Sequence, residues 1–142
     1  MDARDVATHA HLVGAAALDD EDLRQRHLVL AEPHREPGDL GFPVWRTMGG
    51  IVGMCICNDR RWPETYGVMG LQGVEMILIG YNTPIHYAPD PGQNSLQGFH
   101  NQLVMQAGAY QNGTWVVGVA KGGNEEGVES LAQSVIVAPS GQ

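Results

Sequence analysis

Both cysteines of the chain lie in one short stretch, residues 54–64, whose sequence is MCICNDRRWPE. Cys57 stands where a run of apolar residues ends, and Arg60 and Arg61 follow within four residues. A thiol is a good nucleophile only as its thiolate, which guanidinium groups and a helix N-terminus favour. The backbone N–H of Asn58 would face an oxyanion that forms beside Cys57. The stretch therefore indicates a nucleophilic cysteine for acyl transfer.

A purely structural role is the simpler alternative, because cysteine often packs as a small buried hydrophobe. We expect that role for Cys55, which lies inside the apolar run, and leave both roles open for Cys57. If both residues lie on one strand, their side chains point to the same face, which hinders a disulfide between them. A Cys-x-Cys metal or redox site is a third alternative. We expect no metal, because no second pair of ligands has the usual spacing.

Apolar segments separated by turn residues predict the elements that must position this stretch. We expect strands at residues 42–46, 51–57, 74–79, 114–120 and 134–137, and helices at residues 21–32, 62–72 and 95–111. Strands alternating with helices indicate an α/β protein, with a mixed sheet and helices on its face. Cys57 would then end a buried strand just before a helix, at the edge where open α/β sheets gather their sites.

Composition narrows the classes of partner. The chain has 142 residues, of which 43% are hydrophobic and 17% charged, an ordinary balance for one globular domain. Its formal net charge of -8 repels phosphates, so we expect no nucleic-acid partner. Its apolar runs are too short to span a membrane, and its N-terminus lacks the pattern of a signal peptide. We therefore expect a cytoplasmic protein without disulfides.

Longer strings carry a more specific pattern. They are EPGDLGFPV at residues 36–44, CNDRRWPE at 57–64, GYNTP at 80–84 and MQAGAYQNGTW at 105–115, followed by AKGG and VAPSG. In these strings the chain resembles the carbon–nitrogen hydrolase (nitrilase) superfamily, and within it the N-carbamoyl-D-amino-acid amidohydrolases. We divide the chain accordingly into residues 1–35, which match poorly, and residues 36–142, a partial carbon–nitrogen hydrolase domain.

The resemblance implies an α-β-β-α sandwich that carries a Glu–Lys–Cys triad and uses no cofactor. It implies hydrolysis of an N-carbamoyl-D-amino acid to the D-amino acid, CO2 and NH3. Cys57 matches the cysteine that attacks the ureido carbonyl and is carbamoylated, and the backbone amide of Asn58 matches an oxyanion donor. Relatives pair through surfaces beside the site, so we expect a homo-oligomer.

Further residues are implied to bind the small carbamoyl or amide substrate. Arg60 and Arg61 match residues that hold a substrate carboxylate, which suits the two-pronged donors of a guanidinium group. Asn82 and Thr83 match additional substrate contacts. Two simpler roles remain open, a solvated or capping arginine pair and ordinary turn chemistry for the Asn-Thr-Pro sequence.

The implied triad is incomplete in this sequence. No lysine precedes Cys57, and the chain's only lysine, Lys121, does not match the family's position. The acidic residues before Cys57 include Glu21, Glu32 and Glu36, none of which lies in the family's glutamate motif. The alternative hypothesis is therefore a non-catalytic or inactive fragment of the same family, a partial copy that lacks the glutamate and the lysine.

Overall fold

Residues 40–142 are the part of the chain that the computed structural model describes. The helix expected at residues 21–32 lies outside this part, as do the glutamates that precede Cys57. The strands are β1 (Val44–Thr47), β2 (Gly50–Ile56), β3 (Met76–Tyr81), β4 (Trp115–Ala120), β5 (Gly122–Glu125), β6 (Val128–Leu131) and β7 (Val135–Val137). The helices are α3 (Pro63–Leu71) and α4 (Gln97–Asn112), with 3-10 helices η1 (Cys57–Arg61) and η2 (Pro91–Leu96).

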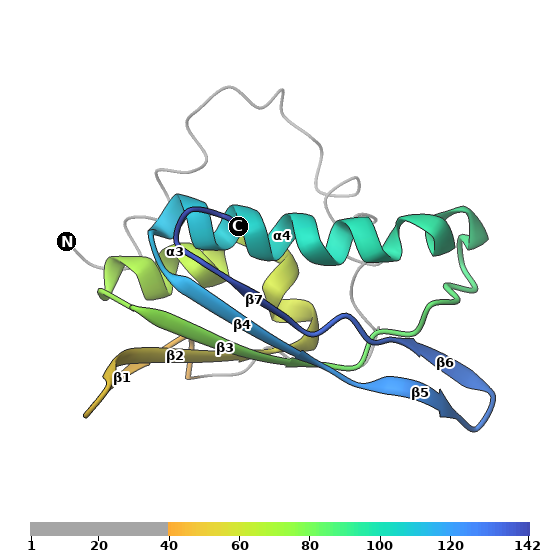
Figure 1. Ribbon diagram of the computed structural model, residues 1–142, viewed down its shortest axis with the longest axis horizontal. Helices are drawn as coiled ribbons and strands as arrows, with labels where there is room; N and C mark the ends of the chain where they lie inside the picture. The colour runs from red at the N-terminus through yellow and green to blue at the C-terminus, as the bar shows by residue number, and fades with distance from the viewer. Residues whose placement is uncertain (1–39) are drawn as a thin grey trace. The chain divides into compact units, whose positions relative to one another are not determined.

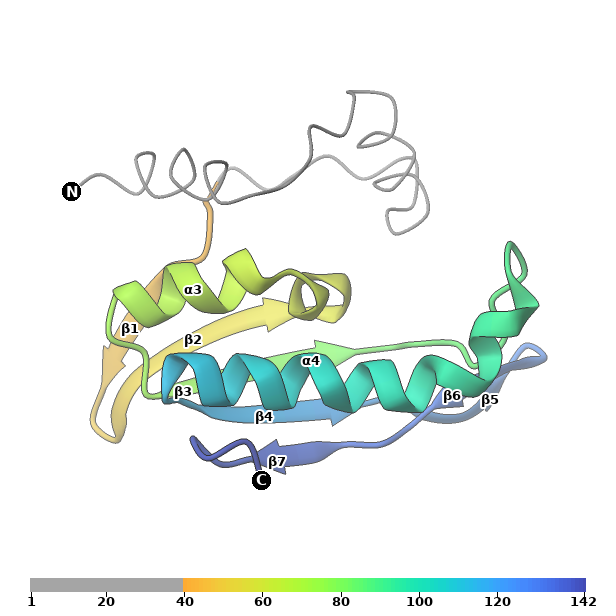
Figure 2. The ribbon, with the colours of Figure 1, turned by 90° about the horizontal axis from the view of Figure 1, so that it is seen from above.

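The main sheet has the strand order β1-β2-β3-β4-β7 (Figure 1). Its three central strands are parallel, and an antiparallel strand lies at each edge. The crossovers between the parallel strands are α3 and α4, which lie over the same face of the sheet (Figure 2). The predicted α/β class, with a mixed sheet and helices on its face, is confirmed.

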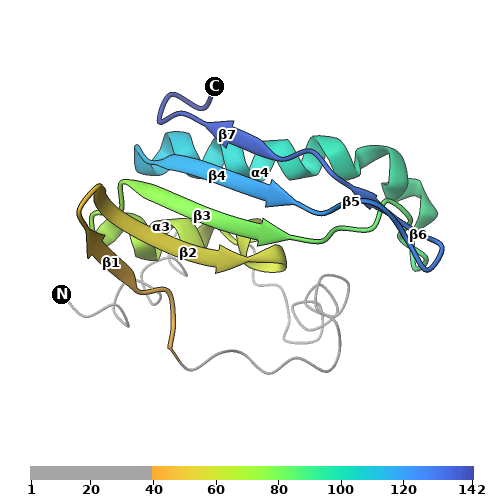
Figure 3. The same cartoon turned by 60° about the horizontal axis from the view of Figure 1, so that its bottom comes forward.

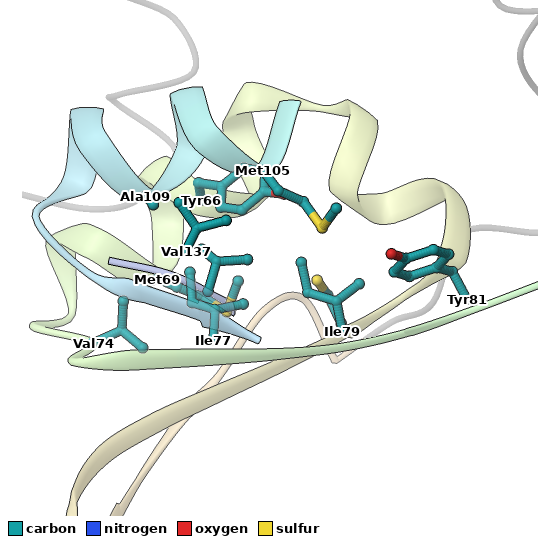
Figure 4. Packing of buried hydrophobic residues seen from close by; sticks show 11 residues of the cluster. Tyr66, Met69, Val74, Ile77, Ile79, Tyr81, Met105, Ala109 and Val137 are labelled. Carbon is teal, nitrogen blue, oxygen red and sulfur yellow. The ribbon is translucent and has the colours of Figure 1, made fainter. Parts of the chain in front are cut away.

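The core lies between the sheet and its two helices (Figure 4). On β3, Ile77, Ile79 and Tyr81 point toward the helices and are almost completely buried. Met69 of α3 and Met105 of α4 meet them with no exposed surface. Each such side chain stabilises the fold by roughly 1.5–3 kcal/mol through burial. The alternation of buried and exposed residues along β3 is what period-two strand geometry requires.

The opposite face of the main sheet is also apolar, but none of the described elements covers it (Figure 3). One row across this face joins Val52, Met76 and Trp115. Ile136 lies in the adjacent row and Ile56 in the row beyond it, and their side chains are 67% and 64% exposed. Exposed apolar side chains in neighbouring rows of one face are typical of an interaction site.

The hairpin formed by β5 and β6 was not among the expected elements. All four residues of β5 are exposed, so no apolar alternation marks the strand in the sequence. The turn between the strands is Glu126-Gly127, and both residues have positive φ, at 52° and 83°. Two central residues with positive φ suit a tight two-residue hairpin turn.

Candidate active site

Cys57 lies directly after β2, as the first residue of η1. The expected strand at residues 51–57 therefore ends one residue early, and the two cysteines do not share a strand face. Cys57 has a φ of 44°, in the left-handed region that costs a residue with a side chain roughly 1–2 kcal/mol. The half-buried thiol stays at the C-terminal end of a central strand, as expected.

Cys55 is 5% exposed and belongs to the core beneath the helices. Burial raises the pKa of its thiol to about 12; the negative charge of Asp59 adds to this effect and Arg60 opposes it. A thiol with so high a pKa is neutral and unreactive near neutral pH. The predicted buried position of Cys55 is confirmed.

Asp59 fixes the turn that carries the thiol. Its carboxylate accepts a hydrogen bond from the backbone N–H of Ile56 at 2.9 Å. Its carbonyl oxygen accepts another from the N–H of Trp62 at 3.2 Å. The chain then enters α3 at Pro63, whose fixed φ suits a first helical position. The sequence NDRRWPE thus turns sharply from strand to helix immediately behind Cys57.

Arg60 points into the protein and is 1% exposed. Its Nε donates to Asn101 Oδ1 at 3.1 Å, and its Nη2 donates to Thr83 Oγ1 at 2.8 Å. Its Nη1 donates to the backbone carbonyl of Cys57. Its Cζ also lies 4.3 Å from the centre of the Tyr81 ring. All of these groups belong to the protein, so the geometry does not present Arg60 to a substrate in the way the resemblance implied.

Arg61 is less deeply placed than its neighbour. Its Nη2 donates to Gln97 Oε1 at 3.4 Å, a long hydrogen bond that holds the guanidinium loosely. Burial, followed by the charge of Arg60, lowers the pKa of Arg61. The negative charges of Cys57 and Tyr87 act in the opposite direction. Arg61 therefore lies close enough to Cys57 to respond to its charge, and among the described residues only Gln97 accepts a hydrogen bond from it.

The loop after β3 brings Asn82 and Thr83 beside the cysteine. The thiol of Cys57 lies 3.9 Å from the carbonyl oxygen of Asn82. The side-chain oxygen of Asn82 accepts a hydrogen bond from Ser130 Oγ at 3.1 Å. Strand β6 holds this loop further, because the N–H of Leu131 donates to the carbonyl of Thr83 at 2.8 Å. The hairpin that the sequence did not predict thus supports the site.

The structure places the Cys57 thiol beside Asn82, with Arg61 at the end of the same 3-10 helix. Thr83 is 7% exposed, and its hydroxyl accepts a hydrogen bond from Arg60. Sequence reasoning missed Asn101, Tyr81 and Ser130, all of them buried. The detectable signal was weak, since Asn101 is simply a polar residue in the middle of a helix. Lys121, excluded as catalytic, forms an ion pair with Glu125.

Two negative observations hold for the described residues. Between residues 40 and 142, no three His, Cys, Asp or Glu side chains gather as metal ligands would. Within the same range, no helix has the length and apolar character needed to cross a bilayer.

Comparisons with known proteins agree on one family. The model of the carbon–nitrogen hydrolase family matches residues 5–142. N-carbamoylputrescine amidase of Solanum tuberosum is 35% identical over 117 residues, which cover 75% of this chain and 38% of the relative. Citrullinase of Francisella tularensis subsp. tularensis is 43% identical over 77 residues, 54% of this chain and 26% of the relative. A carbon–nitrogen hydrolase structure from Helicobacter pylori superposes with a TM-score of 0.66 at 22% identity, covering 75% of this chain and 39% of that one.

The chain belongs to the carbon–nitrogen hydrolase family. Its fold is nitrilase-like, with one helix layer and one sheet layer in the described part. It spans about two-fifths or less of the length of the relatives it matches. The division into residues 1–35 and 36–142 stays a prediction.

Proposed function

We propose that this chain carries the nucleophile half of a hydrolase for N-carbamoyl amino acids, with Cys57 as the covalent catalyst. The observation that carries the proposal is the placement of Cys57. Its thiol stands at the C-terminal end of a central parallel strand, in a turn with positive φ, and Arg61 ends the same 3-10 helix that Cys57 begins. Sites of α/β proteins gather at this end of a sheet, and a left-handed turn lifts a side chain clear of the strand.

The proposed substrate has a ureido group and a carboxylate. N-carbamoylputrescine and citrulline, named in two relatives, both contain a ureido group, which supports the first part. Arg61 supports the second, because a guanidinium with unused donors binds a carboxylate through two hydrogen bonds. The side chain of Asn82 is proposed as a further substrate contact, and Thr83 as support for its loop. Preference for the D series rests on the sequence resemblance alone.

In the proposed reaction the thiolate of Cys57 attacks the ureido carbonyl carbon, and a C–S bond forms. The N–H of Asn58 stabilises the oxyanion. The bond from that carbon to the amino-acid nitrogen then breaks, and the amino acid leaves with a proton. Water cleaves the carbamoyl thioester, releasing carbamate, which gives CO2 and NH3. Both stages need proton transfer, which the implied glutamate and lysine would supply in a complete triad.

A non-catalytic chain of the same family is the second candidate, and a specific observation favours it. Among the described residues, Cys57 Sγ has a single hydrogen-bond partner, the carbonyl of Asn82, which cannot act as a base. The exposed apolar face of the main sheet supports association with further polypeptide, whether a second copy or a longer hydrolase partner. Self-association therefore remains a proposal.

Ammonia release distinguishes the two candidates. The purified chain is incubated with N-carbamoyl-D-amino acids, their L forms and N-carbamoylputrescine, and ammonia is measured with a coupled enzyme. We expect Cys57→Ala to abolish release and the matched variant Cys55→Ala to retain it. Binding of N-carbamoyl amino acids by calorimetry, lost in Arg61→Met and without any product, would instead support the non-catalytic chain.

A further inference from the structure

We propose that Arg60 is a positioning residue that orients the peptide bond between Cys57 and Asn58, and through it the N–H that faces the oxyanion. This inference rests on the proposed function, because it assumes that Cys57 is acylated. It gives Arg60 a different task from the carboxylate binding that the resemblance implied for both arginines.

Arg60 is buried although it carries a charge. A guanidinium taken out of water loses several kcal/mol of hydration, so it stays buried only where the protein supplies well-placed acceptors. Arg60 is 1% exposed, and within residues 40–142 its hydrogen-bond acceptors are all neutral oxygens. The ring of Tyr81 offers its negative face to the same group at 4.3 Å. Each of the three guanidinium nitrogens thus donates one hydrogen bond to the protein, so the fold holds this side chain in one orientation.

The guanidinium of Arg60 binds the peptide group that joins Cys57 and Asn58. In a trans peptide the C=O of one residue and the N–H of the next point in opposite directions within one plane. Arg60 Nη1 donates to the carbonyl of Cys57, so it fixes the direction in which the N–H of Asn58 points. A donor on the carbonyl also polarises the amide, which makes the N–H a stronger donor. Cys57 needs such a clamp, because its φ of 44° is a strained conformation that would relax without support.

Arg60 also connects the cysteine turn to other elements of the fold. Thr83, in the loop after β3, and Asn101, on α4, each accept a hydrogen bond from Arg60. Asn101 Nδ2 in turn donates to Tyr81 Oη at 3.2 Å, and Tyr81 Oη donates to the carbonyl of Gln133 at 2.6 Å. Arg60 therefore ties the cysteine turn to two neighbouring parts of the fold, which a surface arginine could not do.

Two thiol reagents separate this role from a general structural one. Para-nitrophenyl acetate acylates the thiolate: a C–S bond forms at the acetyl carbon through an oxyanion, nitrophenolate leaves, and the thiol proton goes to solvent. Iodoacetamide alkylates the same thiolate by displacement of iodide, without an oxyanion. The ratio of the two rates at Cys57 therefore reports the oxyanion donor and cancels changes in thiolate population or exposure. Both reactions are single events and do not need the whole triad.

We expect Arg60→Lys to lower the acylation-to-alkylation ratio by about tenfold to a hundredfold. This loss should not exceed the roughly hundredfold to thousandfold loss that follows removal of a whole oxyanion donor, because the N–H of Asn58 is still present. Thr83→Val, which removes one of the guanidinium's acceptors at nearly constant shape, should lower the ratio by roughly threefold to tenfold. The control is Arg46→Met, a change at an exposed arginine of β1, which should leave the ratio unchanged. Circular dichroism establishes that each variant is folded; if Arg60→Lys is not, Thr83→Val decides.

The outcomes separate the inference from the function beneath it. If the wild-type chain acylates Cys57 no faster than the urea-unfolded chain does, the proposed nucleophile fails. If wild-type acylation is fast but the ratio is the same in Arg60→Lys and Thr83→Val, only the positioning role is overturned. Equal losses in acylation and alkylation would also overturn it, because the arginine would then act on the thiol and not on the oxyanion donor.

Discussion

The two cysteines should differ in reactivity by orders of magnitude, and the difference follows from Cys55. Its pKa is raised to about 12, so about one molecule in 10,000 carries the Cys55 thiolate near pH 8. An ordinary thiol with a pKa of about 8.5 is roughly one-quarter ionised at that pH. Cys55 should therefore react roughly three orders of magnitude more slowly than a free thiol, before its 5% exposure slows it further.

The assay is alkylation by iodoacetamide at about pH 8, quenched at intervals, with each cysteine quantified by peptide mass spectrometry. We expect Cys57 to be labelled while Cys55 stays unmodified, and both to be labelled at similar rates in urea. Because the Cys55 pKa is raised, its labelling should grow about tenfold for each pH unit until the chain unfolds. Labelling of Cys55 at a rate close to that of Cys57 in the folded chain would refute the assigned burial and the reasoning built on it.

Two predictions concern the packing that supports the site. Gly108→Ala should lower the free energy of unfolding by roughly 1–3 kcal/mol in urea titrations, because an added Cβ would lie 2.5 Å from the Tyr66 ring. The matched change Gly67→Ala should raise the free energy of unfolding by about 0.5–1 kcal/mol, because an added Cβ there has nothing within 4 Å. Equal effects of the two changes would contradict the close approach of α3 and α4. Tyr66→Phe should be neutral or stabilising, because the buried hydroxyl has no hydrogen-bond partner within the described residues. Burial also raises the Tyr66 pKa, so the folded state holds the Tyr66 proton more tightly than the unfolded state does. The free energy of unfolding should therefore fall as the pH rises above about 10, and it should fall less steeply in Tyr66→Phe. An unchanged alkaline slope in Tyr66→Phe would count against this.

The main sheet was predictable because its signals are local. Residues 51–57 form a short apolar run bounded by turn residues, and the structure places β2 there with an error of one residue. Pro63 and Gly73 similarly mark the start and the end of α3. The β5–β6 hairpin was missed because β5 is wholly exposed and the buried residue of β6 is the polar Ser130, so neither strand shows an apolar alternation in the sequence.

The site was only partly predictable for a different reason. The position of Cys57 follows from its place at the end of an apolar run. The inward orientation of Arg60 depends on Asn101, which lies 41 residues further along the chain on another element. No local pattern around Arg60 and Arg61 tells which of the two adjacent arginines is buried and which is partly exposed. Such long-range polar contacts are visible only once the fold is known.

The most direct measurement of the central claim is the mass of the cysteine peptide after incubation with an N-carbamoyl amino acid and an acid quench. We expect one carbamoyl group on Cys57, none on Cys55, and none on either when the chain is unfolded in urea first. Release of ammonia by the wild-type chain and by Cys57→Ala at equal rates, with no adduct on Cys57, would contradict it.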